Sequence, residues 1–393
     1  MAKYKLFNDP IYGLINFQYE ILYKVIDSAV FQRLRRISQM GLSSYVYPGA
    51  NHTRFQHALG ALWLTDAAMN VLEYKGTTIS KEEKIATNLA ILCHDIGHGP
   101  FSHALEGILI RPHHEAISIQ IMRLLAVEHD FDFDLAIAIM EGTYDKVFLH
   151  QLISSQLDMD RMDYLSRDSF YSGVAEGVIG YDRIIKMLAV VDNQLVLEEK
   201  GIYSVEKFFM ARHLMYWQVY LHKTSLAAEM MLISIVRRIR FLVGKGSTVL
   251  GSKKFIQLLL QEEESLDLFL SLDDTDVFMT IKENCEADDV ILKFLCNSIV
   301  KRQLYHVILQ IEPINQNLIL NAKKSILDKF GVSQEDLGYF VFEGNVGNKM
   351  YDDTEDVLMV ITKSEGLKTA SELLPTLKRP NWVNKNYFIY ARH

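Results

Sequence analysis

The residues with the greatest capacity for chemistry gather early in the chain, where seven of the thirteen histidines lie between residues 51 and 114. The densest stretch is ILCHDIGHGPFSHALE, at Ile91–Glu106. In it, His94 and Asp95 come where a helical pattern ends, and two more histidines follow on a turn with Gly and Pro. Buried imidazole and carboxylate groups are stable only with polar partners. A divalent metal ion supplies such partners, because it binds imidazole nitrogen and carboxylate oxygen well. We therefore expect the chemistry of this chain here.

Three predicted helices must position the ligands of such a metal. A capping box from Ser80 to Glu83 opens the helix that ends at His94. The preceding helix, predicted over 52–74, carries His57. If a short turn joins these two helices as an antiparallel pair, His57 comes to lie beside His94. The carboxylate-rich sequence LDMDRMDY supplies the candidates for a fourth ligand, and spacing alone does not choose among them: Asp158, Asp160 and Asp163.

Two imidazoles and two carboxylates form a mixed nitrogen and oxygen site that suits Fe, Mn, Zn, Ni or Co. A metal held in this way lowers the pKa of bound water and polarises a phosphoryl oxygen. The alternative interpretation is that these histidines cap helices and form satisfied polar groups of the core. Cys93, beside the predicted ligands, is interpreted as a small buried hydrophobe.

Hydrophobic periodicity predicts a mainly α-helical body followed by a smaller C-terminal α+β portion. Helical spacing of apolar residues covers 20–37, 52–74, 114–129, 133–140, 157–171 and 204–243, the last as one long helix or two abutting ones. Strand-like patterns occur at 304–311, 338–342, 357–361 and 387–391, with a helix at 315–330. We predict three regions: a core at 1–235 with its motif region at about 52–168, a helical extension at 236–300, and the α+β portion at 301–393.

Composition limits the class of protein. The 393 residues include 49% hydrophobic residues and carry a net charge of −8, which disfavours a surface for nucleic-acid backbone. The three cysteines have no CxxC spacing, which favours a reducing compartment. No apolar run is long enough to span a bilayer. We therefore expect a cytoplasmic protein without a membrane partner. The acidic run at 261–276 is predicted to be a solvated loop or helix face.

Six sequence blocks, read together, are similar to one known family. They are FNDPIYG, FQRLRRISQMG, YPGANHTRFQHALG, CHDIGHGPFSHALEG, HHEA and LDMDRMDYLSRDSFYSG, spread over about 7–223. The order H…HD…D, as His57, His94, Asp95 and Asp160, is the signature of HD-domain metal-dependent phosphohydrolases. The whole set resembles the deoxynucleoside-triphosphate triphosphohydrolase branch, which includes the mammalian SAM-and-HD-domain enzyme and bacterial relatives. We expect no SAM domain ahead of this core.

The resemblance implies a ligand set and four catalytic residues. It selects Asp160 among the three candidates, so the implied metal ligands are His57, His94, Asp95 and Asp160. It implies that His103 and Glu106 form a histidine–acid pair at the α-phosphate, with Glu where the mammalian relative has Asp. It places His114 near the leaving oxygen and makes His98 a further active-site histidine. Imidazole suits these roles, because it titrates near neutral pH and can move a proton.

The resemblance also implies contacts to a deoxynucleoside triphosphate (dNTP). The cations expected at its phosphates are Arg54, Arg161, Arg212 and Lys223, with Arg161 replacing a lysine of the family. Tyr164 corresponds to a sugar-stacking tyrosine that excludes a 2′-hydroxyl, and Tyr220 to an aromatic that faces the sugar or base. Gln39 and Asp168 correspond to the pair that reads the 3′-hydroxyl. For these tyrosines, ordinary core packing is the alternative.

A regulatory nucleotide site is a weaker implication of the same resemblance. Asp27, Gln32 and Arg35 match positions that bind a guanine-nucleotide activator in the mammalian relative. Arg183 and Lys200 fall near other activator-binding positions of that relative. Glu198 and Glu199 depart from the basic pattern there, and the segment over 20–37 also has a plain role as an amphipathic helix. The expected cofactors are one divalent transition metal and Mg on the nucleotide phosphates. The expected partners are a dNTP substrate, a GTP or dNTP activator and, by analogy, further copies of this chain in a homo-oligomer.

The predicted reaction is metal-dependent hydrolysis of a dNTP to a deoxynucleoside and inorganic triphosphate. One rival is an HD phosphohydrolase that acts on an NTP, a nucleoside monophosphate or a guanosine alarmone. Tyr164, Gln39 and Asp168 argue against it, because they imply recognition of deoxyribose. Other rivals are a non-catalytic nucleotide sensor, a single-stranded nucleic-acid-binding protein, and a structural oligomer whose histidines are incidental.

Overall fold

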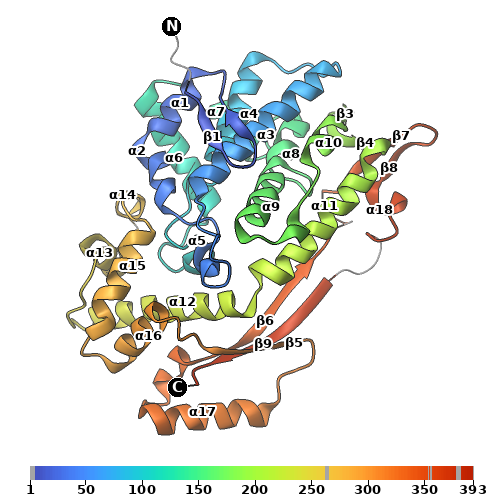
Figure 1. Ribbon diagram of the computed structural model, residues 1–393. Helices are drawn as coiled ribbons and strands as arrows, with labels where there is room; N and C mark the ends of the chain where they lie inside the picture. The colour runs from blue at the N-terminus through green and yellow to red at the C-terminus, as the bar shows by residue number, and fades with distance from the viewer. Residues whose placement is uncertain (1–4, 262–264, 353, 355, 378–381, 393) are drawn as a thin grey trace.

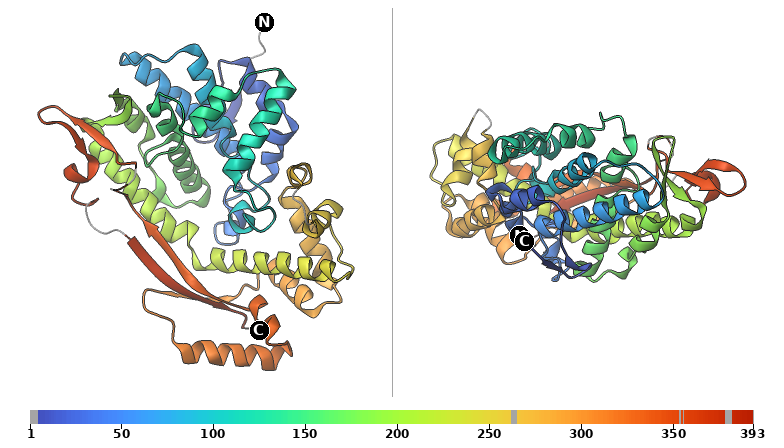
Figure 2. Two further views of the ribbon diagram at one scale, coloured as in Figure 1. Left: turned by 180° about the vertical axis from the view of Figure 1, so that it is seen from behind. Right: turned by 90° about the horizontal axis from the view of Figure 1, so that it is seen from above.

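The computed structural model describes residues 5–261, 265–352, 354, 356–377 and 382–392, and it is mainly helical, as predicted. A body of packed helices stands above two long helices, α11 (Ile202–Met215) and α12 (Lys223–Gly244), with a three-stranded sheet below them (Figure 1). Seen from behind, the C-terminal strands pass along the side of the molecule that these two helices form (Figure 2). Within the described ranges, no helix combines the length and apolar character that crossing a membrane requires.

Three helices form the centre of the body: α3 (Arg54–Tyr74), α4 (Lys81–Cys93) and α9 (Met159–Ser172). Helix α4 begins at the predicted capping box, in which the backbone N–H of Ser80 donates to the Glu83 carboxylate and the backbone N–H of Glu83 donates to the Ser80 hydroxyl. This cap fixes the start of α4, and thereby the position at which its C-terminal end delivers a histidine to the site.

A glycine allows α3 and α9 to pack closely. A Cβ added at Gly60 would lie 2.0 Å from an Asp163 carboxylate oxygen and 2.2 Å from the Arg167 guanidinium, so no larger residue fits without displacement. Asp163 and Arg167 are buried and paired, and Arg167 also pairs with Asp9. His57 lies one helical turn before Gly60, so this approach holds His57 against α9.

The remaining helices are shorter or lie further from the centre. Their bounds are α1 Glu20–Asp27, α2 Ala29–Gln32, α5 Ser102–Leu105, α6 His114–His129, α7 Asp134–Met140, α8 Val147–Ile153, α10 Tyr181–Lys186, α13 Lys253–Leu260, α14 Leu266–Leu270, α15 Asp274–Glu283, α16 Val290–Val300, α17 Gln316–Phe330 and α18 Ala370–Leu373. The predicted helices over 52–74, 114–129, 133–140, 157–171 and 315–330 are confirmed to within two residues at each end.

Two predicted helices are not continuous. The segment over 20–37 breaks at Ser28, whose backbone is extended and whose hydroxyl caps α2, and it ends in a 3-10 turn at Arg33–Arg36. The segment over 204–243, predicted as one long helix or two abutting ones, forms two helices. A π-helical turn at Tyr216–Tyr220 and an extended His222 separate α11 from α12. Such π-turns are frequent at functional sites.

Within the described residues, the strands form a hairpin and two small sheets. The hairpin pairs β1 (Phe7–Asp9) with β2 (Gly13–Ile15). One sheet has the order β3 (Leu188–Val191), β4 (Gln194–Glu198), β7 (Met359–Thr362) and β8 (Gly366–Thr369). The other has the order β5 (His306–Gln310), β9 (Trp382–Tyr390) and β6 (Val341–Lys349). Pairing of β4 with β7 is parallel and joins segments more than 150 residues apart, since Val196 faces Met359.

The strand predictions are confirmed in part. The segments 304–311, 357–361 and 387–391 overlap β5, β7 and the end of β9, whereas 338–342 spans the end of a 3-10 turn (Glu335–Tyr339) and the first two residues of β6. Strands β1, β2, β3, β4 and β8 lie outside the predicted strand segments. The expected boundary at residue 235 falls inside α12, which runs across it without a break. Of the acidic run, residues 262–264 lie outside the described residues, and the rest includes α14 and the start of α15.

Candidate metal centre and adjoining pocket

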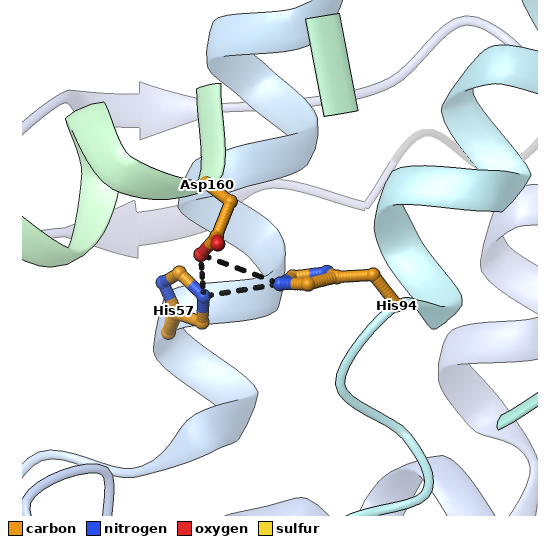
Figure 3. Close-up of side chains that lie close together, drawn as sticks. All are labelled: His57, His94 and Asp160. Atoms are coloured by element: carbon orange, nitrogen blue, oxygen red, sulfur yellow. Dashed lines mark hydrogen bonds and ion pairs between the residues drawn. The ribbon is translucent and has the colours of Figure 1, made fainter. Parts of the chain in front are cut away.

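Three donor atoms from three helical segments converge in the body (Figure 3). His57 Nε2 lies 3.0 Å from Asp160 Oδ1 and 3.3 Å from His94 Nε2, and His94 Nε2 lies 3.5 Å from Asp160 Oδ1. Ligands about 2.1 Å from one metal ion stand about 3.0 to 3.4 Å apart, so these separations match a shared cation. The donor set of two imidazoles and a carboxylate fits a first-row divalent metal.

The other nitrogen of each imidazole is held by a neighbour. His57 Nδ1–H donates to Asp163 Oδ2 at 2.7 Å, and His94 Nδ1–H donates to the carbonyl oxygen of Ile91 at 2.6 Å. These bonds leave the Nε2 lone pair of both rings facing Asp160. These two lone pairs and the carboxylate repel one another unless a metal ion, or protons on the imidazole nitrogens, lie between them. Partners of this kind fix the ring orientation of histidines that bind metals.

Electrostatics at this point also favour a cation. Burial opposes the charged form of His57, but hydrogen bonds to Asp160 and Asp163 outweigh it and raise the pKa of His57 to about 10. Burial acts to raise the pKa of Asp160, yet the hydrogen bonds from His57 and His94 hold it well below its usual range. A metal ion competes with the protons for these nitrogens, so its binding should weaken in acid.

Asp95, the fourth predicted ligand, lies beside this cluster. Its Oδ1 is 3.4 Å from His94 Nε2, and its Oδ2 is 3.6 Å from His57 Nε2. The same carboxylate also pairs with the Arg54 guanidinium and lies 3.2 Å from His98 Nε2. Asp95 can therefore contribute to a metal site while linking it to a second group of histidines.

That second group joins Asp95 to His98 and His114, whose rings stack with centroids 3.8 Å apart. Glu106 belongs to it, because His114 Nδ1–H donates to Glu106 Oε1 at 2.6 Å. Although burial acts to raise the pKa of Glu106, the hydrogen bonds from His114 lower it to about 2. The expected pairing of Glu106 with His103 is therefore replaced by a pairing with His114. Helix α5 ends at Leu105 and the backbone of Glu106 is extended, so Glu106 no longer shares a helix face with His103.

A pocket of about 340 Å³ contains the predicted sugar-binding residues. It is lined by Gln39, Met40, Ser43, His103, Tyr164, Asp168, Tyr216, Tyr220, Leu221 and Glu229. Asp168 accepts hydrogen bonds from Tyr220 and from His52, each at 2.7 Å. The side-chain oxygen of Gln39 is buried and has no hydrogen-bond partner among the described residues, so it can accept a bond from a ligand hydroxyl.

The four cations predicted at the phosphates lie in different surroundings. Arg54 is buried and donates to Asp95 and to the Ser102 hydroxyl. Arg161 is partly buried and bonds to Asp158 and to the Ser155 carbonyl. The Arg212 guanidinium lies 5.9 Å from the ring centroid of Tyr216, and within the part of the chain that the structure describes its buried Nε has no hydrogen-bond partner. Lys223 is exposed at the start of α12 and does not line the pocket.

The residues of the predicted regulatory site lie apart from this pocket, near the N-terminal helices. Asp27 is exposed and pairs with Lys5. Gln32 donates to the carbonyl oxygen of Ile26 and accepts from Arg35, whose guanidinium lies 3.6 Å from the ring centroid of Phe55. Arg183 donates to the Lys200 carbonyl on another face. Gln32 and Arg35 contact each other, whereas Asp27 pairs with Lys5, and local packing already accounts for these contacts.

Sequence reasoning missed several residues of the site. His52 lies in the histidine-rich segment but had no assigned role, and it orients Asp168. Tyr216 and Glu229 line the pocket, and burial raises the pKa of Glu229 to about 7. The π-turn that presents Tyr216 has no periodic signature, and Glu229 lies within α12, where helical spacing gives it no role, so only the structure reveals these two residues.

The fold and the converging donors define a helical domain with a candidate metal centre, and comparison with known proteins gives its class. The model of the HD domain matches residues 54–168, and the model of the HD associated region matches residues 179–393. The second match alone covers more than half of the chain. The chain belongs to the HD-domain phosphohydrolase family, in the form in which an HD associated region follows the HD domain.

Named relatives and a solved structure agree with this assignment. The protein YwfO of Bacillus subtilis is 30% identical over 359 residues, which are 90% of this chain and 82% of that protein. A deoxynucleoside triphosphate triphosphohydrolase SAMHD1 homolog of Dictyostelium discoideum is 32% identical over 58% of this chain and 48% of its own. A phosphohydrolase from Bacteroides thetaiotaomicron is 42% identical, with a TM-score of 0.94 over 99% of this chain and 100% of that one.

The contact between Asp163 and His57 gives a first prediction. Asp163→Asn removes the charged acceptor of His57 Nδ1–H and is expected to weaken metal affinity by about 10- to 100-fold, because such partners set the orientation and basicity of the ligand. Competition with a fluorescent zinc chelator measures the affinity. Asp182→Asn, at an exposed position of α10, is the control. An affinity of the Asp163 variant equal to that of the control would contradict the prediction.

Proposed function

We propose that this protein hydrolyses deoxynucleoside triphosphates to a deoxynucleoside and inorganic triphosphate in a metal-dependent reaction. The observation that carries the proposal is the arrangement of one face of α9. Asp160, Tyr164 and Asp168 are spaced four residues apart, so they lie in one row along the helix. The row begins at the candidate metal centre and continues into the pocket, whose volume suits a nucleoside.

In this proposal, His57, His94, Asp95 and Asp160 hold the metal. A divalent ion bound there supplies Lewis-acid polarisation of a phosphoryl oxygen and a more acidic water. The sugar 3′-hydroxyl donates its one proton to the side-chain oxygen of Gln39, Asp168 lies beside the same hydroxyl, and Tyr164 closes the space beside C2′. Mg carried on the phosphates is part of the same proposal.

Proton movement falls to the histidines. Water attacks the α-phosphorus, a new P–O bond forms, and the bond from phosphorus to O5′ breaks. Burial and the nearby Arg54 lower the pKa of His103 to about 4, so its neutral ring can accept the proton of the water. His114, held by Glu106, donates a proton to O5′ as the deoxynucleoside leaves. The guanidinium groups of Arg54, Arg161 and Arg212 offset the charge of the phosphates.

The experiment that tests the proposal is a product assay. Purified protein is incubated with Mn²⁺ or Fe²⁺ and with each dNTP and NTP separately, with and without GTP, and the products are resolved by chromatography. We expect a deoxynucleoside and triphosphate in equal amounts from dNTPs. Stepwise loss of phosphate would overturn the proposal in favour of another phosphohydrolase reaction. A rate that rises with GTP, and a mass in solution that rises with it, would support the activator and homo-oligomer parts of the proposal.

The position of Tyr164 gives a second prediction. Its ring lies in the pocket with its centroid 6.1 Å from that of Tyr220. Tyr164→Ala opens the space beside C2′ and is expected to raise the ratio of NTP to dNTP turnover by at least about 10-fold, a difference of about 1.4 kcal/mol between the two transition states. Measured kcat/KM values for dATP and ATP give this ratio. Tyr203→Ala, at an exposed position of α11, is the control, and an unchanged ratio would remove the support for a 2′-hydroxyl gate.

A further inference from the structure

One segment of the HD associated region lies against the loop that follows the HD residues. We call it the clamp segment, residues 269–274. Its first side chain, Phe269, packs so closely on Gly99 that a Cβ added there would lie 2.6 Å from the ring. Buried Arg33 joins the same two parts, because its guanidinium donates to the Leu272 carbonyl and to the carbonyls of Ile96 and His98.

The end of the clamp segment makes two further bonds, to two different parts of the site. Asp274 Oδ1 accepts from the backbone N–H of Phe101 at 2.8 Å, and Asp274 Oδ2 accepts from the backbone N–H of Ser38 at 2.8 Å. Ser38 precedes Gln39, and Phe101 comes two residues before His103, and both Gln39 and His103 line the pocket. One carboxylate therefore joins the backbones that carry two pocket residues.

The backbone at Phe101 requires such support. Its φ of 45° lies in the left-handed region, which is rare for a residue with a large side chain. A conformation of this kind persists only where its surroundings hold it, and it is frequent at functional sites. Phe101 immediately precedes α5, so its backbone angle sets the direction in which His103 leaves the loop.

We propose that Asp274 is a positioning residue of the active site, through which the HD associated region holds Gln39 and His103 at a fixed separation across the pocket. Asp274 touches neither substrate nor metal in this proposal, and its effect on turnover rests on the proposed function. The proposal gives the HD associated region a direct part in the geometry of the HD domain, rather than a separate role.

The test uses the whole protein and the variants Asp274→Ala and Asp274→Asn. Hydrogen exchange measured by mass spectrometry should show faster exchange, by at least about 10-fold, in peptides that contain residues 38 and 101, because both backbone N–H groups lose their acceptor. Asp274→Asn retains one acceptor oxygen and should release one of the two segments. Asp267→Asn, an exposed acid in α14, is the matched control and should leave both peptides unchanged.

Steady-state kinetics distinguish positioning from a merely structural role. For the folded fraction of Asp274→Ala, with metal content equal to the wild type, we expect kcat to fall by at least about 10-fold and KM for the dNTP to rise. Exchange as slow as in the control, or unchanged kcat and KM per folded molecule, would overturn the proposal. If the wild-type protein turns over no dNTP, the proposed function fails, whereas the exchange result still decides whether Asp274 holds the two segments.

Discussion

Asp160→Asn is expected to lower kcat/KM for dNTP hydrolysis by about a thousandfold or more and to leave the purified protein without its metal. The Asp160 carboxylate faces the Nε2 atoms of both His57 and His94, and asparagine takes away the charge that offsets a divalent cation there. A thousandfold loss corresponds to about 4 kcal/mol of transition-state stabilisation, within the range that a metal ion contributes. Elemental analysis of the metal and kinetics on the same preparation test both parts.

The matched control for this variant is Asp182→Asn, which makes the same chemical change at an exposed position of α10. It should retain full metal content and activity. Removal of metal from the wild-type protein by a chelator should reproduce the loss seen in Asp160→Asn, and added Mn²⁺ or Fe²⁺ should restore only the wild-type protein. Activity of Asp160→Asn within tenfold of the wild type, without bound metal, would contradict the assignment of Asp160.

The largest expected effect on stability comes from Arg167→Ala. The Arg167 guanidinium is buried and bonds to both oxygens of Asp163 and to Asp9, all at 2.8 to 2.9 Å. Removing it leaves buried carboxylates without their cation, which typically destabilises a protein by about 3 to 5 kcal/mol. Unfolding in urea, followed by circular dichroism, measures the change as a lower midpoint with an unchanged slope.

Arg183→Ala provides the comparison, because Arg183 is exposed and, among the described residues, its guanidinium donates to the Lys200 carbonyl and to no carboxylate. Its effect should stay within about 0.5 kcal/mol, as is usual for surface positions. A similarly small effect for Arg167→Ala would contradict the prediction. It would mean that water hydrates the carboxylates of Asp163 and Asp9 once the guanidinium is removed, although the structure buries them. The Arg167 variant should also bind metal more weakly, because Asp163 is the acceptor that orients His57.

The donors of the metal centre were visible in the sequence, but their geometry was not. Asp158, Asp160 and Asp163 stand within six residues, and spacing left their roles open. In the folded chain Asp158 caps α9, Asp163 holds His57 Nδ1, and Asp160 faces His57 Nε2. Their roles are set by how α9 docks on α3, a contact between parts of the chain about 100 residues apart. No local pattern encodes that contact.

The pairing of Glu106 shows a different limit. A spacing of three residues indicates one helix face only while the helix continues. Helix α5 has four residues and ends at Leu105, so Glu106 turns to His114 instead of His103. Gly107 follows Glu106 directly, and a glycine at this position is the local signal in the sequence that the helix ends near Glu106.

The C-terminal region is predicted as an α+β portion. Its helix and the strands β5 and β7 lie within two residues of their predicted bounds, whereas β9 begins five residues before the segment predicted for it. What the pattern could not supply was the partner of each strand. Strand β7 pairs with β4 of the preceding region, and β9 lies between β5 and β6. Pairing across more than 150 residues leaves no trace in local periodicity. The glycines of β6, Gly344 and Gly347, also weaken its pattern as a strand.

The parallel pairing of β4 with β7 has a consequence for any shortened version of this protein. Strand β4 carries the buried residues Leu195, Val196 and Leu197, and β7 covers its free edge. A chain cut before residue 359 would keep the HD domain and yet expose an apolar strand edge with unpaired backbone groups. Such edges recruit strands from other molecules. Shortened forms should therefore aggregate at high concentration, through a surface far from the residues that perform the chemistry.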